Sequence, residues 1–89
     1  MRLERCRCEN VYVYILETLR CNPSKYYVGI TSNLKERLQN HNDGRSKYTA
    51  AFRPWRYKNF FWFSDPEKAF AFERYLKSGS GRAFANRHF

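Results

Sequence analysis

Two ionisable side chains, Arg37 and His41, are spaced so that they lie next to the apolar residues of an expected helix. In the stretch YYVGITSNLKERLQNH, from Tyr26 to His41, a strand-like segment leads directly into a segment with helical periodicity. At 3.6 residues per turn, Arg37 and His41 fall on the same side of that helix as Leu34 and Leu38. Two polar groups therefore lie along the apolar seam of this helix.

A third ionisable group, Glu73, lies on the apolar face of a later helix. Ala69, Phe72, Glu73 and Leu76 occupy positions i, i+3, i+4 and i+7, which form the side of a helix that meets a sheet. Burying an unpaired carboxylate costs several kcal/mol, so Glu73 needs a partner. An arginine such as Arg37, water reached from an edge position, or a divalent metal ion would each serve.

The segments around these groups alternate between strand and helix patterns. The run VYVYIL from Val11 to Leu16 and the run from Tyr26 to Thr31 flank a Cys-Asn-Pro-Ser turn, which predicts an antiparallel hairpin. Alternation places Tyr12 and Tyr14 on one face of the first strand and its valines on the other. Trp55 to Phe63 predicts a third strand.

Capping signals predict two helices. Asn33, followed by Glu36, resembles a capping box and predicts a helix from Leu34 to about His41. The stretch Ser64-Asp65-Pro66-Glu67, with Ser64 as the expected cap, predicts a second helix that ends near Lys77. Residues 44–54 are polar and basic, and we expect a loop there that grips a phosphate backbone.

Length and charge indicate one small domain with a polyanionic partner. The chain has 89 residues and a formal charge of +9, and its basic residues are spread widely, which favours a folded basic face. We expect a basic lead-in at residues 1–10 and a single domain at residues 11–89. Three cysteines, Cys6, Cys8 and Cys21, without a secretion signal favour reduced thiols over disulfides or a zinc site.

These segments, in this order, resemble the GIY-YIG nuclease family, and most closely the small stand-alone members related to the nuclease domain of the excinuclease ABC C subunit. The matching residues are Val13-Tyr14, Tyr27-Val28-Gly29, Arg37, His41 and Glu73. Tyr12 stands where the first motif usually has its glycine. The resemblance spans roughly residues 11–84.

The resemblance implies an α/β (α+β) fold, a small three-stranded antiparallel sheet flanked by helices, and metal-dependent hydrolysis of a DNA phosphodiester. Tyr14 and Tyr27 would lie over the scissile phosphate, and one of them would orient or deprotonate the attacking water. Arg37 would stabilise phosphoryl charge, and His41 would relay a proton or hold a phosphate. Glu73 would bind Mg²⁺ or Mn²⁺. A tyrosine is a poor base at neutral pH unless positive charge stabilises its phenolate.

The partner and setting follow from the same resemblance. The residues expected to bind DNA phosphates are Arg45, Lys47, Arg53, Arg56 and Lys58. We expect structure-selective or nonspecific cutting in DNA repair, recombination or processing. RNA stays open as a substrate, and so does a non-catalytic nucleic-acid-binding module or a subunit of a larger repair complex. No apolar run reaches the roughly 20 residues of a membrane span, so we expect a soluble, cytoplasmic protein of bacterial or phage origin.

Overall fold

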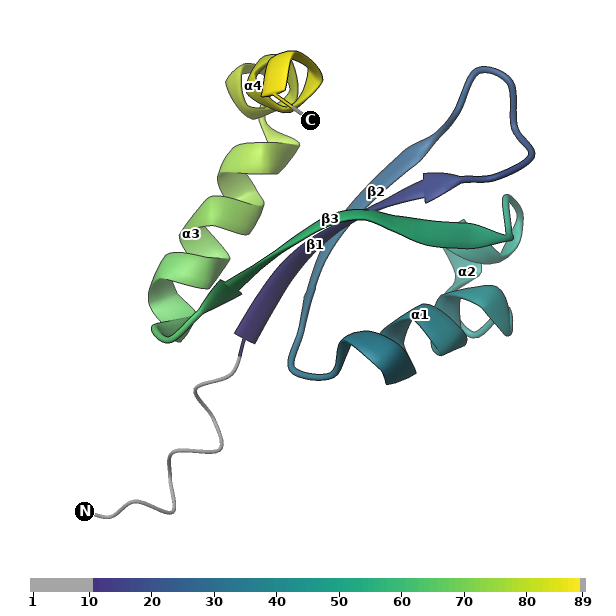
Figure 1. Cartoon of the computed structure of the whole chain (residues 1–89), viewed down its shortest axis with the longest axis horizontal. Helices are drawn as coiled ribbons and strands as arrows, with labels where there is room; N and C mark the ends of the chain where they lie inside the picture. The colour runs from purple at the N-terminus through teal and green to yellow at the C-terminus, as the bar shows by residue number, and fades with distance from the viewer. Residues whose placement is uncertain (1–10, 89) are drawn as a thin grey trace.

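Three antiparallel strands form the centre of the domain. The structure is a computed structural model that describes residues 11–88, except the side chain of Asn86. The expected lead-in at residues 1–10, with Cys6 and Cys8, lies outside the described residues. Strands β1 (Val11–Thr18), β2 (Tyr26–Thr31) and β3 (Trp55–Phe63) pair in the order β2-β1-β3 (Figure 1). The predicted hairpin, third strand and fold class are confirmed.

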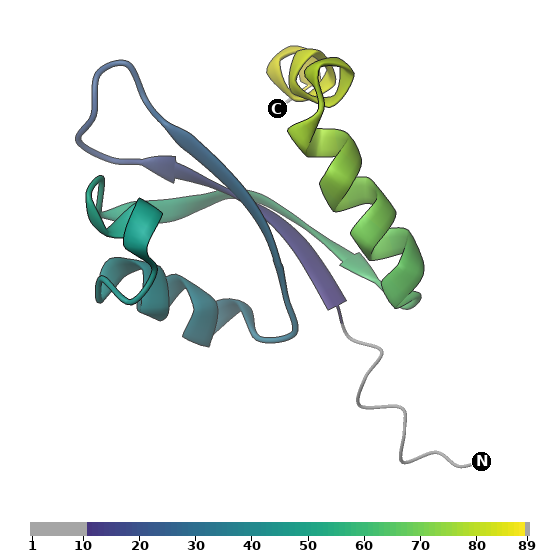
Figure 2. The same ribbon diagram turned by 180° about the vertical axis from the view of Figure 1, so that it is seen from behind.

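Two pairs of helices cover opposite sides of this sheet. Helices α1 (Leu34–Asn42) and α2 (Lys47–Ala50) lie on one side, and α3 (Pro66–Lys77) and α4 (Gly79–His88) lie on the other (Figures 1 and 2). On the α3 side, Val13 and Ile15 pack against both of these helices. On the α1 side, Tyr14 and Leu16 pack with Trp55. The predicted alternation along β1 is confirmed, and it directs Tyr14 toward α1.

The cap predicted at Asn33 is confirmed for α1, and the cap predicted for α3 is wrong by one residue. The Glu36 backbone N–H donates to the Asn33 side chain at 3.0 Å. The Asn33 backbone N–H donates to the Thr31 hydroxyl at 3.1 Å, and not to the Glu36 side chain as in a capping box.

Asp65, not Ser64, caps α3, because the Glu67 backbone N–H donates to its carboxylate at 3.0 Å. Helix α3 begins at Pro66, whose fixed φ suits the first helical position, so the residue directly before it, Asp65, is the cap.

Two short helices were not predicted. The loop expected at residues 44–54 contains α2, and the chain resumes as α4 directly after α3. The second predicted helix does end at Lys77, and Gly81 lies in the first turn of α4. A Cβ at Gly81 would lie 1.7 Å from the Tyr75 carbonyl oxygen, so this glycine allows α4 to start tightly against the end of α3.

Asn42 fastens the end of α1 to the start of β3. Its side-chain oxygen accepts from the Trp55 backbone N–H at 2.7 Å, and its amide donates to the Trp55 carbonyl at 3.1 Å. The indole of Trp55 also donates to the Thr49 carbonyl at 2.8 Å. These bonds fix α1, and therefore Arg37 and His41, relative to the sheet.

Replacing Asn42 should loosen this attachment. We expect Asn42→Ala to lower the free energy of unfolding by about 2 kcal/mol, because it removes two hydrogen bonds from part-buried backbone groups. Urea denaturation measures the change. Gln39→Ala, an exposed position of the same helix, is the control and should change the free energy by less than about 0.5 kcal/mol. Equal effects of the two substitutions would contradict this assignment.

Candidate active site

The hydroxyl of Tyr14 is the meeting point of the predicted site. Tyr14 is fully buried. Its hydroxyl oxygen accepts a hydrogen bond from Arg37 Nε at 3.0 Å and lies 3.0 Å from His41 Nε2. Strand β1 supplies the tyrosine, and one face of α1 supplies both partners, as the helical spacing predicted.

Thr49 determines which way His41 hydrogen-bonds. His41 Nδ1 lies 2.7 Å from the Thr49 hydroxyl, which itself donates to the Ser46 carbonyl at 3.4 Å. Because that hydroxyl donates elsewhere, it accepts from Nδ1–H, which leaves Nε2 to accept the proton of Tyr14. Thr49 lies in the stretch expected to be a loop, so nothing in the sequence marked it as part of the site.

Burial keeps both His41 and Tyr14 uncharged. Burial, with a smaller contribution from the Arg37 charge, lowers the pKa of His41 to about 4. Burial also raises the pKa of Tyr14, outweighing the hydrogen bond and positive charge of Arg37. Arg37 therefore acts on Tyr14 in the expected direction but does not produce a phenolate on its own. The hydrogen bond to Tyr14 in turn raises the pKa of Arg37.

Gly29 makes room for Tyr14. The two residues are direct partners in the β1–β2 ladder, and a Cβ on Gly29 would lie 2.3 Å from the Tyr14 hydroxyl oxygen. In the structure, the group that comes close is the ring of the first-motif tyrosine.

Tyr27 is the accessible tyrosine of the pair. Its ring centroid lies 6.4 Å from that of Tyr14 and 5.1 Å from that of His41, and its side chain is only partly buried. Tyr27 also contributes to the raised pKa of Arg37. Arg37 therefore lies within reach of both tyrosines, one buried beneath it and one open to solvent.

Glu73 approaches Tyr27 from α3 and is paired with a lysine. Lys77 Nζ lies 2.7 Å from Glu73 Oε2 and 5.9 Å from the centre of the Tyr27 ring. The Glu73 side chain is 16% exposed, and its charge helps to raise the pKa of Tyr14. Of the partners weighed for Glu73, Arg37 is not the one found: Lys77, one helical turn away, takes that place.

Glu73 suits a hydrated divalent ion better than a protein cage. Among residues 11–88, no three His, Cys, Asp or Glu side chains cluster as a metal site. Mg²⁺ commonly keeps several waters and uses one or two carboxylates together with substrate phosphate oxygens. A single, partly exposed carboxylate beside the tyrosines fits that pattern of binding.

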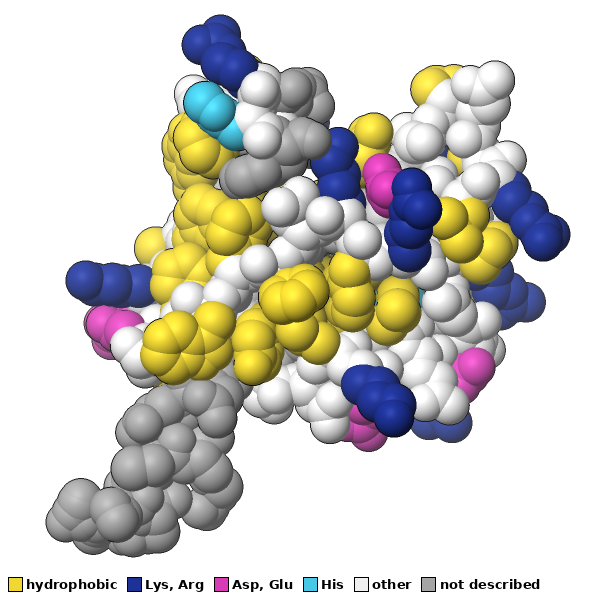
Figure 3. Space-filling view, viewed as in Figure 1, with side chains coloured by type: hydrophobic (Ala, Val, Ile, Leu, Met, Phe, Trp, Pro, Cys, Tyr) yellow, Lys and Arg dark blue, Asp and Glu magenta, His cyan; other side chains and the backbone are white. Residues whose placement is uncertain are grey.

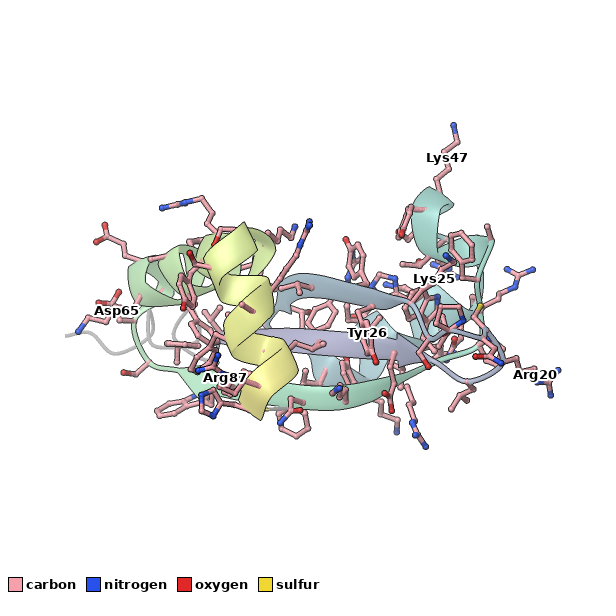
Figure 4. All side chains as sticks on the ribbon, turned by 90° about the horizontal axis from the view of Figure 1, so that it is seen from above. Arg20, Lys25, Tyr26, Lys47, Asp65 and Arg87 are labelled. Carbon is pink, nitrogen blue, oxygen red and sulfur yellow. The ribbon has the colours of Figure 1, made fainter. Side chains whose placement is uncertain are left out.

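The predicted phosphate-binding residues come from two parts of the fold, the segment around α2 and strand β3. Arg45, Lys47 and Arg53 are exposed around α2, and Lys47 projects away from the sheet (Figure 4). Arg56 pairs with Glu17 at 2.7 Å, and Lys58 lies 4.8 Å above the Tyr26 ring. On the face that Figure 3 presents, Lys and Arg side chains lie singly around a band of hydrophobic ones.

This geometry defines a small α/β domain in which two tyrosines, an arginine and a histidine from the hairpin and α1 meet a glutamate from α3. A model described as the GIY-YIG catalytic domain matches residues 10–87. The chain belongs to the GIY-YIG family.

The similar curated proteins are bacterial UPF0213 proteins, a name that states no activity. The chain is 37% identical over 67 residues to one from Streptococcus pneumoniae, covering 74% of this chain and 65% of the relative. It is 37% identical over 67 residues to one from Bacillus licheniformis, covering 74% and 66%. The chain thus spans slightly less than two thirds of these relatives. No solved structure gives a significant match.

The membrane prediction is tested only for helices. None of the helices within residues 11–88 has the length and apolar character that crossing a bilayer requires.

Adding a methyl group at Gly29 should displace Tyr14. We expect Gly29→Ala to lower nuclease activity by at least about 100-fold and the free energy of unfolding by about 1 to 3 kcal/mol, because the Cβ would overlap the Tyr14 ring. Plasmid cleavage and urea denaturation measure the two effects. Gly79→Ala, whose Cβ would meet nothing within 4 Å, should change neither. A fully active Gly29→Ala protein would contradict the packing described here.

The low pKa of His41 should appear as acid sensitivity. Its folded pKa of about 4 lies below the ordinary histidine pKa of 6.5, so the unfolded chain binds this proton more tightly. The resulting stability is fully present above about pH 6.5 and is lost as the pH falls toward about 4. We expect a loss of about 2 kcal/mol from this group, measured by urea denaturation across that range.

The control for this prediction is His41→Gln, which has no titrating ring. The difference in unfolding free energy between wild type and His41→Gln should shrink as the pH falls through the same range. A difference that stays constant with pH would refute the assigned pKa.

Proposed function

We propose that this domain is a metal-dependent DNA endonuclease that hydrolyses phosphodiester bonds in DNA repair, recombination or processing. Its cutting is either selective for the structure of the DNA or nonspecific. The observation that best supports this proposal is Arg37, held by buried, neutral Tyr14 and close to accessible Tyr27. A guanidinium beside a partly exposed tyrosine is suited to a phosphoryl group under attack by water.

The accessible tyrosine has the role nearest to the substrate. Tyr27 orients the attacking water. As the new phosphorus–oxygen bond forms and the bond to the leaving oxygen breaks, the attacking water gives its proton to the surrounding solvent, and the leaving oxygen takes a proton from solvent. Arg37 stabilises the charge that builds on the phosphoryl oxygens. Tyr14 and His41 are positioning residues, because they hold Arg37 from below and are covered by other side chains.

Glu73 is the residue that would hold Mg²⁺ or Mn²⁺. The ion would supply positive charge to the phosphate oxygens and to the attacking water. Lys77 is the present partner of Glu73, and an ion there would replace the lysine ammonium as the partner of the carboxylate. Lys77 would then be available for a phosphate oxygen.

The Glu73–Lys77 ion pair also favours a second candidate, a non-catalytic nucleic-acid-binding module. A carboxylate that is already neutralised at 2.7 Å has less need of a metal ion. The basic and aromatic side chains would be sufficient for binding in that case.

Cleavage of plasmid and branched DNA tests the proposal. With Mg²⁺ or Mn²⁺, wild type should nick these substrates, and EDTA should abolish nicking. Tyr27→Phe and Glu73→Gln should each lower the rate by at least about 100-fold. Tyr14→Phe removes the acceptor of Arg37 and should also lower the rate. Binding of the same DNA in EDTA should stay within a few fold for all three variants.

The matched control is Tyr75→Phe, an exposed tyrosine of α3, which should cut at the wild-type rate. Wild-type protein that binds DNA but cuts none of these substrates would refute the proposed nuclease activity and favour the non-catalytic binding module. Cutting that survives Glu73→Gln would refute the role of Glu73.

A further inference from the structure

A groove of about 630 Å³ adjoins the candidate active site. Its floor includes Val28 and Ile15 of the sheet, and its walls come from the α3–α4 junction and from α2. Figure 4 shows Tyr26 and Lys25 on this part of the sheet, between α4 and α2. Because Tyr27 and Lys77 also line it, the groove opens directly onto the residues proposed to meet the scissile phosphate.

The charged residues that line the groove are all positive. Lys25, Lys58, Lys77 and Arg82 come from four different segments of the chain and line the same groove, and no carboxylate is among the described residues that line it. Glu17 is the direct strand partner of Tyr26, and Arg56 neutralises it at 2.7 Å. Lys77 is paired with Glu73 at 2.7 Å, so Lys25, Lys58 and Arg82 supply the positive surface on which a chain of phosphates would be stabilised.

Tyrosine rings lie among these cations. Tyr26 is 49% exposed and Tyr48 is 55% exposed, and both line the groove together with Tyr27. Tyr48 stacks on Tyr27 with ring centroids 6.2 Å apart and planes 30° apart, while Lys58 lies over Tyr26. Exposed rings next to cations provide stacking platforms for bases beside sites for phosphates.

This combination distinguishes between two forms of nucleic acid. A paired duplex keeps its bases stacked on each other, so it would use the cations and leave the tyrosine faces without a base. An unpaired strand offers both its phosphates and its base faces. Neither Tyr26 nor Tyr48 belongs to the matched motifs, and neither is needed to hold Arg37 or His41.

We propose that this groove binds an unpaired segment of the nucleic-acid substrate, with Tyr26 and Tyr48 stacking on its bases and Lys25, Lys58 and Arg82 contacting its phosphates. The inference rests on the proposed function and specifies its substrate class. The preferred substrates carry single-stranded DNA next to the cut, such as flaps and free single strands, rather than uninterrupted duplex.

Fluorescence anisotropy with wild-type protein in EDTA tests the groove without requiring cleavage. The probes are a short labelled oligothymidylate and a blunt duplex of the same length. The single strand should bind more tightly. Tyr26→Ala should weaken its binding by about 10-fold and change duplex binding by less than about 2-fold. Tyr26→Phe, which keeps a stacking ring, should bind the single strand nearly as wild type does.

Two control variants match the changes in exposure and charge. Phe70→Ala removes a ring of α3 that is 48% exposed and does not line the groove, so it should leave single-strand binding unchanged. Lys58→Ala should reduce the slope of log affinity against log salt for the single strand by about 0.7. Lys68→Ala, at an exposed position of α3 outside the groove, should leave that slope unchanged.

The outcomes for the groove and for the enzyme can be told apart. Equal affinity for both probes, or single-strand binding that Tyr26→Ala does not weaken, would contradict the proposal that the groove binds an unpaired strand. Metal-dependent cutting would still support the proposed nuclease activity in that case. Tyr26-dependent binding of the single strand without any cutting would support single-strand binding in the groove and contradict the proposed nuclease activity. An acidic polypeptide that competes as well as an unlabelled oligonucleotide would show a general polyanion surface and overturn the groove.

Discussion

The site depends on the hydrogen bonding of one buried hydroxyl. A phenol removed from water must find partners inside the protein, and the Tyr14 hydroxyl finds them in Arg37 and His41. Two consequences follow for the rest of the fold. Helix α1 must lie across β1 with its polar seam facing the sheet, and β2 must have no side chain opposite Tyr14, which Gly29 provides. Helix α1 cannot move away without leaving this hydroxyl unpaired.

The order of the strands allows groups from both sides of the sheet to meet. Tyr27 belongs to β2, an edge strand, and its ring lies near His41 on the α1 side. Helix α3 packs on the opposite side, yet it brings Lys77 near the same ring. A central strand would separate the two layers completely. At the edge, the carboxylate of Glu73 and the guanidinium of Arg37 can serve one substrate.

Local signals in the sequence predicted most of the framework. The pleat of β1, the cap at Asn33 and the helical spacing of Arg37 and His41 are all short-range features, and the structure confirms them. The Glu73–Lys77 pair is equally local, at i and i+4, yet Lys77 was not among the partners expected for Glu73.

Thr49 and Asn42 could not be foreseen in the same way. Thr49 orients a histidine eight residues away, and Asn42 binds the backbone of Trp55, thirteen residues away. Both depend on how the segment between α1 and β3 folds back, and that segment has polar side chains and no clear periodicity. The α4 helix was not predicted for a different reason. Gly79 and Gly81 are typical of the end of a helix, and the sequence does not show that Gly81 lies against the Tyr75 carbonyl.

The charges in the site follow from this burial. His41 is neutral because its pKa is about 4, and Tyr14 is neutral because burial raises its pKa. Arg37 is therefore the charged member of its network, held by partners that do not cancel its charge. Lys77 is neutralised by Glu73 at present, so a phosphate arriving at Tyr27 first meets Arg37. Because Tyr27 also stacks on Tyr48 at the groove, a base bound there and a phosphate at Arg37 would contact the same tyrosine pair from two directions.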